Sequence, residues 1–285
     1  MACLLCQWSS CVGVLDGQSH VTARWGYRSR RRVMGSEQVQ EKLKAWFNNT
    51  GFPLEIYSSR AFHRARFAVE QSAIYLDTDE EKGREIDLLA YVRDATSCFA
   101  SFFAIECKSS DKPWIVLTNK SQYSRFGALS IAALSGHARI AIGAKVSDYV
   151  LAYEDYLGPS SGGYALKQAF AGQTDLAYAA SMGSVKAASA IVEREKSALA
   201  FGFPVIVVNT PIYEYSESHD GKQQFEEVRA SSFEFSAYLG RHTRSVIRIV
   251  SKEYLSEFTV QCAELAQRYE RLFAAEVREA SVAGT

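Results

Sequence analysis

The apolar segment from Phe203 to Val208 is the feature that most constrains the fold of this 285-residue chain. It is an almost unbroken run of strand-forming residues, which is typical of a strand buried on both faces. Such a strand needs neighbouring strands at its sides and helices above and below it. The run therefore predicts an α/β domain in which a mixed central sheet is flanked by helices.

Composition agrees with a globular domain and excludes several other classes of protein. Hydrophobic residues make up 47% and charged residues 22% of the chain, which are ordinary values. The 32 basic and 32 acidic residues give a formal net charge of zero, so nucleic acid would have to bind at a local patch. No apolar run reaches the roughly 18 residues of a membrane span. The six cysteines are too irregularly spaced for a secreted disulfide framework, and we expect a cytoplasmic protein.

The first 34 residues differ from the rest of the chain. Cys3 and Cys6 form a CxxC pair, but no second pair follows at the spacing of a zinc finger. Arginines cluster between Arg24 and Arg32 and could contact phosphate. We interpret residues 1–34 as a disordered leader that need not belong to the native start, and residues 277–285 as a flexible tail. The domain between them then spans residues 35–276.

The first half of this domain reads as a helix followed by three strands. Helical periodicity begins at Ser36 and ends before Gly51. Segments 67–76, 85–92 and 98–108 have the composition of strands, and the connections between them are short and polar. Short connections join antiparallel neighbours, so we predict an antiparallel meander.

The sequence patterns after about residue 120 are less regular. A long Ala-rich helix is expected before the Phe203 to Val208 strand, and an amphipathic helix is expected at the end of the chain. The predicted helices are 126–134, 175–199 and the one starting near 251, and the predicted strands are 138–144, 203–208, 225–235 and 245–250.

The third strand of the meander ends in a charged pair. Because side chains alternate along a strand, Glu106 and Lys108 should point the same way and Cys107 the other. If the second and third strands form a hairpin, Asp87 lies roughly opposite Glu106. The pattern then predicts two carboxylates and one ammonium on one patch of the sheet; the alternative is a solvated face with incidental charges.

Two neighbouring carboxylates repel each other unless a cation lies between them. A hard divalent ion with oxygen ligands, most simply Mg²⁺, would relieve that repulsion. The ion could also bind a phosphate oxygen and activate water. Lys108 could orient or deprotonate that water and neutralise developing charge. The residues therefore favour phosphodiester hydrolysis.

Two segments carry a resemblance to a known family. Arg84-Glu85-Ile86-Asp87-Leu88-Leu89-Ala90 and Ile105-Glu106-Cys107-Lys108 resemble the motifs of the PD-(D/E)xK, or restriction-endonuclease-like, nuclease superfamily, in their Mrr-like form. The resemblance covers about residues 36–118. It implies a restriction-endonuclease-like core, with residues 120–172 and 209–243 as insertions.

The resemblance also implies roles for individual residues. Asp87 and Glu106 match metal ligands, Lys108 matches the motif lysine, and the carbonyl of Cys107 would help to bind the metal. A glutamate on the first helix is common in such sites, which points to Glu41, with Glu37 as the alternative. The implied activity is Mg²⁺-dependent cleavage of nucleic acid, most often DNA, in defence or DNA processing, with Mn²⁺ as a substitute ion.

Several alternatives stay open at this point. A nuclease-like module that is catalytically silent could bind nucleic acid or a partner protein, and the sequence does not decide between a monomer and a homodimer. Lys186 on the long helix could face the site, although water is the simpler expectation, and Trp114 is expected in the core. Candidate contacts to DNA are Arg60, Arg64, Arg66, Arg84, Lys112, Lys120 and Arg125.

Overall fold

The computed structural model divides into two compact units, residues 1–42 and residues 43–285. The first unit contains the start of helix α1 (Ser36–Asn48), which confirms the predicted first helix. The predicted leader, residues 1–34, lies outside the described residues. The structure describes residues 36–118, 126–157, 162–172, 175–196, 198–240 and 242–283.

The second unit alternates helices and strands along the chain. Its α-helices are α2 (Phe52–Arg64), α3 (Gly136–Ile142), α4 (Val146–Leu157), α5 (Leu176–Arg194), α6 (Leu255–Leu272) and α7 (Ala274–Ala283). Its strands are β1 (Ala68–Asp77), β2 (Lys82–Arg93), β3 (Phe99–Lys108), β4 (Trp114–Thr118), β5 (Ala133–Leu134), β6 (Gly163–Gln168), β7 (Leu199–Val208), β8 (Ile212–Glu217), β9 (Gln223–Val228), β10 (Ala230–Tyr238) and β11 (His242–Ser251). Within the described chain, no helix is both long enough and apolar enough to cross a bilayer.

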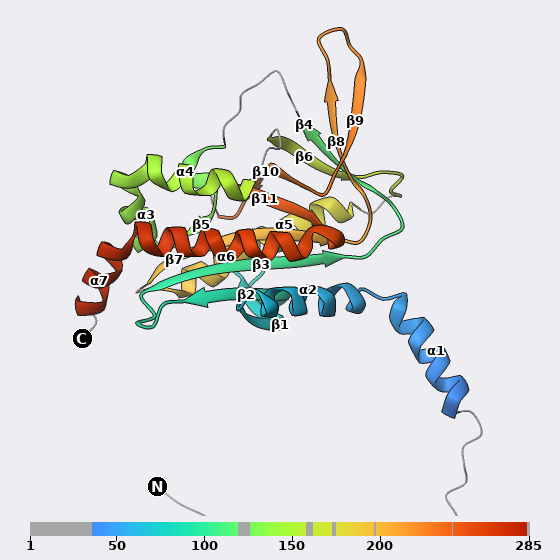
Figure 1. Ribbon diagram of the computed structural model, residues 1–285, viewed down its shortest axis with the longest axis horizontal. Coiled ribbons are helices and arrows are strands. Elements are labelled where there is room, and N and C mark those ends of the chain that lie inside the picture. The colour runs from blue at the N-terminus through green and yellow to red at the C-terminus, as the bar shows by residue number, and fades with distance from the viewer. Residues whose placement is uncertain are drawn as a thin grey trace, which may run out of the picture. The chain divides into compact units, whose positions relative to one another are not determined.

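The strands form one large mixed sheet in the order β1-β2-β3-β7-β11-β10-β6-β4-β8-β9 (Figure 1). Strands β1, β2 and β3 form the predicted antiparallel meander. Strand β7 then pairs parallel with β3 on one side and with β11 on the other. The fold is therefore of the predicted α/β class, with a mixed sheet flanked by helices. Segments 120–172 and 209–243 contribute strands to this same sheet.

Helices cover both faces of the central strands. Helix α5 packs on one face, against β3 and β7, while α2, α4 and α6 contribute to the core on the other face. That second core is rich in aromatic rings; Phe103 and Phe203 stack with centroids 5.0 Å apart. Every residue of β7 is buried, which confirms the prediction made from its apolar run.

The parallel neighbours β3 and β7 end at the same level of the sheet, and each is followed by a short connection to another strand. After β3, residues 109–113 lead into β4, and after β7, residues 209–211 lead into β8; β4 and β8 are again parallel partners. Side chains tie the two connections together, because Asn209 accepts from the amide of Ser110 at 2.9 Å and its Nδ2 donates to Ser109 Oγ at 3.0 Å. The carboxyl end of β3 is thereby fixed against that of β7. The β8–β9 hairpin projects beyond the rest of the sheet (Figure 1).

Two local predictions of secondary structure were wrong. Segment 138–144 lies mainly in helix α3, because Ser135 caps that helix by accepting from Ala138 N and a short apolar run does not distinguish helix from strand. Segment 126–134 contains only a 3₁₀ turn (η1, Ala128–Ser130) and strand β5. Within the expected flexible tail, residues 277–283 lie in α7, where Val277 and Ala280 pack against the core; the flexibility of residues 277–285 stays a prediction.

Candidate functional site

The site is centred on the carboxyl end of β3. Cys107 faces the α2 side, where its Sγ lies 3.7 Å from Ser58 Oγ. Glu106 and Lys108 share the other orientation, and Lys108 Nζ donates to Glu106 Oε2 at 2.7 Å. The alternation predicted from the sequence is therefore present. Glu106 is 8% exposed, which is unusual for a carboxylate and requires partners.

Asp87 on β2 reaches the same point of the sheet. The paired β2–β3 register ends at Leu88↔Ile105, one residue short of Asp87 and Glu106 on their strands. The carboxylate of Asp87 accepts from the backbone amide of Cys107 at 2.7 Å. The half-buried Asp87 is therefore hydrogen-bonded to Cys107, the residue between Glu106 and Lys108.

Helix α2 brings a third carboxylate that the sequence analysis missed. Glu55 lies in the first turn of α2 and is half-buried. Burial raises its pKa, and so does the negative charge of Asp87, the strongest of its charged neighbours. The missed signal was Pro53, two residues after Gly51, since proline is favoured in the first turn of a helix.

The predicted helix glutamate, Glu41, belongs to a different compact unit from Asp87, Glu106 and Lys108. It belongs to the part of α1 in the first compact unit and is exposed, as is its alternative Glu37. A role for Glu41 at the site stays a prediction. Glu55 is the helix glutamate that the structure groups electrostatically with Asp87, Glu106 and Lys108.

The charges of the site shift each other's protonation. Burial raises the pKa of Glu106; Lys108 lowers it and Asp87 raises it, and the net change is upward. Burial alone would lower the pKa of Lys108, but the carboxylate of Glu106 outweighs that effect and the pKa is raised. Lys108 is therefore a stable cation, whereas Glu106 ionises less readily than a solvated glutamate.

A glycine on α5 allows Glu106 to occupy its position. A Cβ atom at Gly183 would lie 2.6 Å from Glu106 Oε1, which is closer than real Cβ contacts come. Any larger residue would displace the carboxylate. Gly183 is thus a part of the site that motif analysis does not reveal, because it lies on a helix far from the motif in sequence.

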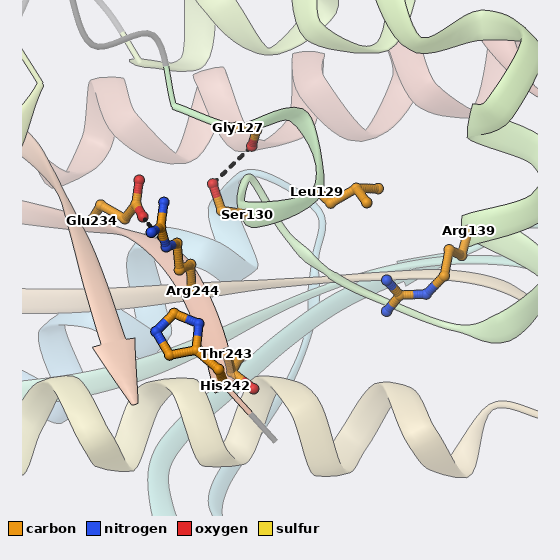
Figure 2. Close-up of a pocket in the computed structure, with 8 residues that line it drawn as sticks. All are labelled: Gly127, Leu129, Ser130, Arg139, Glu234, His242, Thr243 and Arg244. Carbon is orange, nitrogen blue, oxygen red and sulfur yellow. Dashed lines mark hydrogen bonds and ion pairs between the residues drawn. The ribbon is translucent and has the colours of Figure 1, made fainter. Parts of the chain in front are cut away.

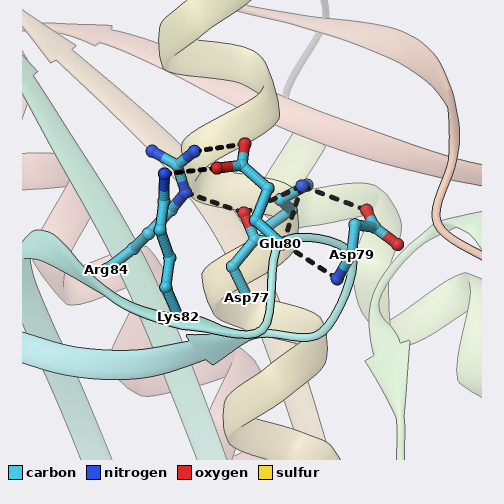
Figure 3. A network of polar contacts seen from close by, with 6 residues as sticks. Asp77, Asp79, Glu80, Lys82 and Arg84 are labelled. Carbon is cyan, nitrogen blue, oxygen red and sulfur yellow. Dashed lines mark hydrogen bonds and ion pairs between the residues drawn. The ribbon is translucent and has the colours of Figure 1, made fainter.

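A second acidic network lies at the β1–β2 turn (Figure 3). Lys186 from α5 contacts both carboxylate oxygens of Asp77, at 2.8 and 2.9 Å, and Arg84 Nε donates to Oδ2 at 2.7 Å. Burial would raise the pKa of Asp77, but Lys186, the amide of Asp79 and Arg84 lower it overall. Lys186 thus binds this network, and the expectation that it faces water was wrong.

The remaining sequence candidates are distributed differently. Trp114 is fully buried, as predicted. Arg84 is committed to Asp77 and Glu80, so its charge is already compensated. Lys120 and Arg125 lie outside the described residues.

A pocket of about 400 Å³ lies near the start of β11, away from these acidic residues (Figure 2). Arg244 pairs there with Glu234 at 3.3 Å, and Arg139 and His242 also line it. None of the predicted site residues contributes to it.

The donor set fits a hard cation. Within the described residues, no three Asp, Glu, His or Cys side chains lie close enough to hold a metal ion in their present positions. Mg²⁺ does not require three, because it usually binds through one or two carboxylates, substrate phosphates and water. Asp87 and Glu106 supply two carboxylates at one strand end, and Glu55 is the nearest addition.

Searches against protein-family models, curated proteins and solved structures give no match to this chain. The functional argument therefore depends on the residues and geometry of the site.

Proposed function

We propose that this protein is a Mg²⁺-dependent nuclease that hydrolyses phosphodiester bonds of DNA, with Mn²⁺ as a substitute ion. The observation that carries the proposal is the junction of Asp87, Glu106 and Lys108 at one strand end, linked by the Cys107 amide and the Lys108–Glu106 pair. A buried glutamate with a raised pKa beside a half-buried lysine is more typical of a functional site than of a solvated sheet face. A restriction-endonuclease-like core and a cytoplasmic location stay part of the proposal.

The carboxylates of Asp87 and Glu106, with the carbonyl of Cys107, would hold the ion. When bound, Mg²⁺ would supply a Lewis acid for the phosphate and lower the pKa of a bound water. The two acidic side chains each have one oxygen engaged by a protein donor, Cys107 N or Lys108 Nζ. Among the residues that the structure describes, the second oxygen of each carboxylate makes no hydrogen bond, and these oxygens are the natural ligands for the ion.

The chain's own residues divide the remaining work. The raised pKa of Lys108 favours a cation that stabilises negative charge on the phosphate over a base that deprotonates water. Glu55 and Glu106 both have raised pKa values, which makes them better proton acceptors than solvated glutamates. Glu106 is tied to Lys108, so Glu55 is left to accept the proton of the attacking water.

The test is cleavage of plasmid and linear DNA in Mg²⁺ or Mn²⁺. Wild type is compared with Asp87→Asn, Glu106→Gln, Lys108→Met and Glu55→Gln. The matched control is Glu193→Gln, which changes an exposed glutamate on α5. We expect metal-dependent cutting by wild type and the control, and losses of about 10²-fold or more for the first three variants.

Two outcomes would contradict the proposal. Equal cutting by wild type and Glu106→Gln would exclude this site as the origin of the activity. No cutting by wild type with either ion, together with DNA binding that the variants leave unchanged, would favour a catalytically silent binding module. Elution volume in the same buffers would separate a monomer from a homodimer.

A further inference from the structure

The carboxyl edge of the parallel strands extends the candidate site sideways. Lys108 pairs in register with Val208 of β7, and Val208 pairs with Ser251 of β11. The three residues therefore form one row across three strands. Neighbouring strands are about 4.8 Å apart, so the row spans roughly 10 Å from the site to the end of β11.

Lys252 follows directly at the end of this row. Its Nζ lies 5.1 Å from the centroid of the Tyr57 ring on α2. A cation over an aromatic face is held in place without losing its charge. Tyr57 is two residues from Glu55, so the first turns of α2 lie along the edge from the acidic site to Lys252.

Lys112 lies in the connection that leaves β3. Its amide donates to Ser110 Oγ at 3.0 Å, and its carbonyl accepts from Thr210 Oγ1 at 2.9 Å. The backbone that carries this lysine is thus fixed on both sides, and it follows the catalytic strand by only four residues.

These two lysines differ from most others in the second unit. Lys82, Lys108, Lys145, Lys167, Lys186 and Lys222 each contact a carboxylate. Among the residues that the structure describes, Lys112 and Lys252 have no carboxylate partner. Lys196 also has none there, but it precedes the start of β7, at the opposite edge of the sheet.

We propose that the carboxyl-terminal edge of β3, β7 and β11 binds the DNA backbone beside the scissile phosphate, through Lys112 and Lys252. The inference rests on the proposed nuclease function and adds to it the path of the substrate. Lysines without a carboxylate partner beside an acidic site attract phosphates that the carboxylates alone would repel. Contacts of this kind position DNA without reading its sequence.

The experiment measures binding of a fluorescein-labelled DNA duplex by anisotropy, with Ca²⁺ replacing Mg²⁺ to limit cleavage. Lys112→Gln and Lys252→Gln are compared with Lys196→Gln at several salt concentrations, and Lys252→Arg tests whether charge restores binding. Each phosphate contact contributes a slope of about −0.9 to the dependence of log K on log salt. We expect Lys112→Gln and Lys252→Gln each to weaken binding several-fold and to reduce that slope by about one.

The outcomes separate this inference from the proposed function. If Lys196→Gln weakens binding as much as the other two, or if neither of those changes the slope, the edge is not the DNA path, even where wild type cuts DNA. If both variants bind DNA more weakly as expected while wild type cuts without any divalent ion, the inference about the DNA-binding edge is supported and the proposal of metal-dependent catalysis fails. Wild type that neither binds nor cuts DNA would overturn both.

Discussion

Asp77 and Glu106 are both buried acidic residues near α5, yet their surroundings have opposite effects. Asp77 contacts two cations and a backbone amide, and its pKa is lowered. Glu106 contacts one cation, has Asp87 as a negative neighbour, and its pKa is raised. Burial raises the pKa of Tyr75, and the negative charges of Glu106 and Asp77 raise it further. Burial alone therefore does not distinguish the two acids; they differ in how completely neighbouring donors and cations compensate the carboxylate.

The largest expected effect is on stability at Asp77. Replacing Asp77 with Ala leaves Lys186, whose side chain is 15% exposed, without its buried partner. Breaking such a pair costs about 3–5 kcal/mol. Urea denaturation should show this loss, and Asp220→Ala, which breaks an exposed ion pair with Lys222, should lose less than about 1 kcal/mol. Equal losses would show that Asp77 is not a structural centre.

The corresponding change at Glu106 should separate stability from activity. Glu106→Gln removes a carboxylate whose ionisation burial opposes, so the unfolding free energy should change by about 1 kcal/mol or less. DNA cleavage should nevertheless fall by about 10²–10³-fold. Both quantities are measured on one preparation, by urea denaturation and plasmid nicking. A large loss of stability with cleavage retained would reverse the roles assigned to the two acids.

Gly183→Ala tests whether the position of Glu106 matters. The added methyl would displace the carboxylate, and misplacement of about 1 Å can cost up to 10²-fold in rate. We expect roughly tenfold slower cleavage with little change in melting temperature, since alanine also favours the helix. Gly143→Ala is the matched control, because a Cβ there meets nothing within 4 Å. Similar rates for the two variants would argue against tight positioning.

The smallest effect is the pH dependence of stability, which should differ in sign between the two acids. Asp77, with a lowered pKa, contributes stability that is present above its ordinary 3.8 and is lost as pH falls through the folded value. Glu106, with a raised pKa, contributes stability that is present below 4.5 and is lost as pH rises through the folded value. The denaturation midpoint should be measured as a function of pH for both variants. In Asp77→Asn it should depend less on pH below about 3.8, and in Glu106→Gln it should depend less on pH above about 4.5.

The sequence predicted the centre of the site better than its surroundings. Strand alternation was enough to orient Glu106 and Lys108, because both follow an unmistakable apolar strand. Glu55 was missed because Gly51 was interpreted as the end of helical structure, whereas a second helix begins at Phe52 with Pro53 in its first turn. The predicted first strand ended at residue 76, so Asp77 fell in the polar connection that follows it. The two cations that contact Asp77 come from residues 84 and 186, and local composition cannot reveal the second of them.

The parallel pairing of β3 with β7 also determines when the site can form during synthesis. Phe99 pairs with Leu199, 100 positions later in the chain, and Gly183 must be in place behind Glu106. A nascent chain that has emerged only as far as β4 contains the whole motif, but its third strand still has an open edge. Contacts of such long sequence separation form slowly. The motif is therefore translated early, but the arrangement of its side chains depends on a helix and a strand that come much later in the chain.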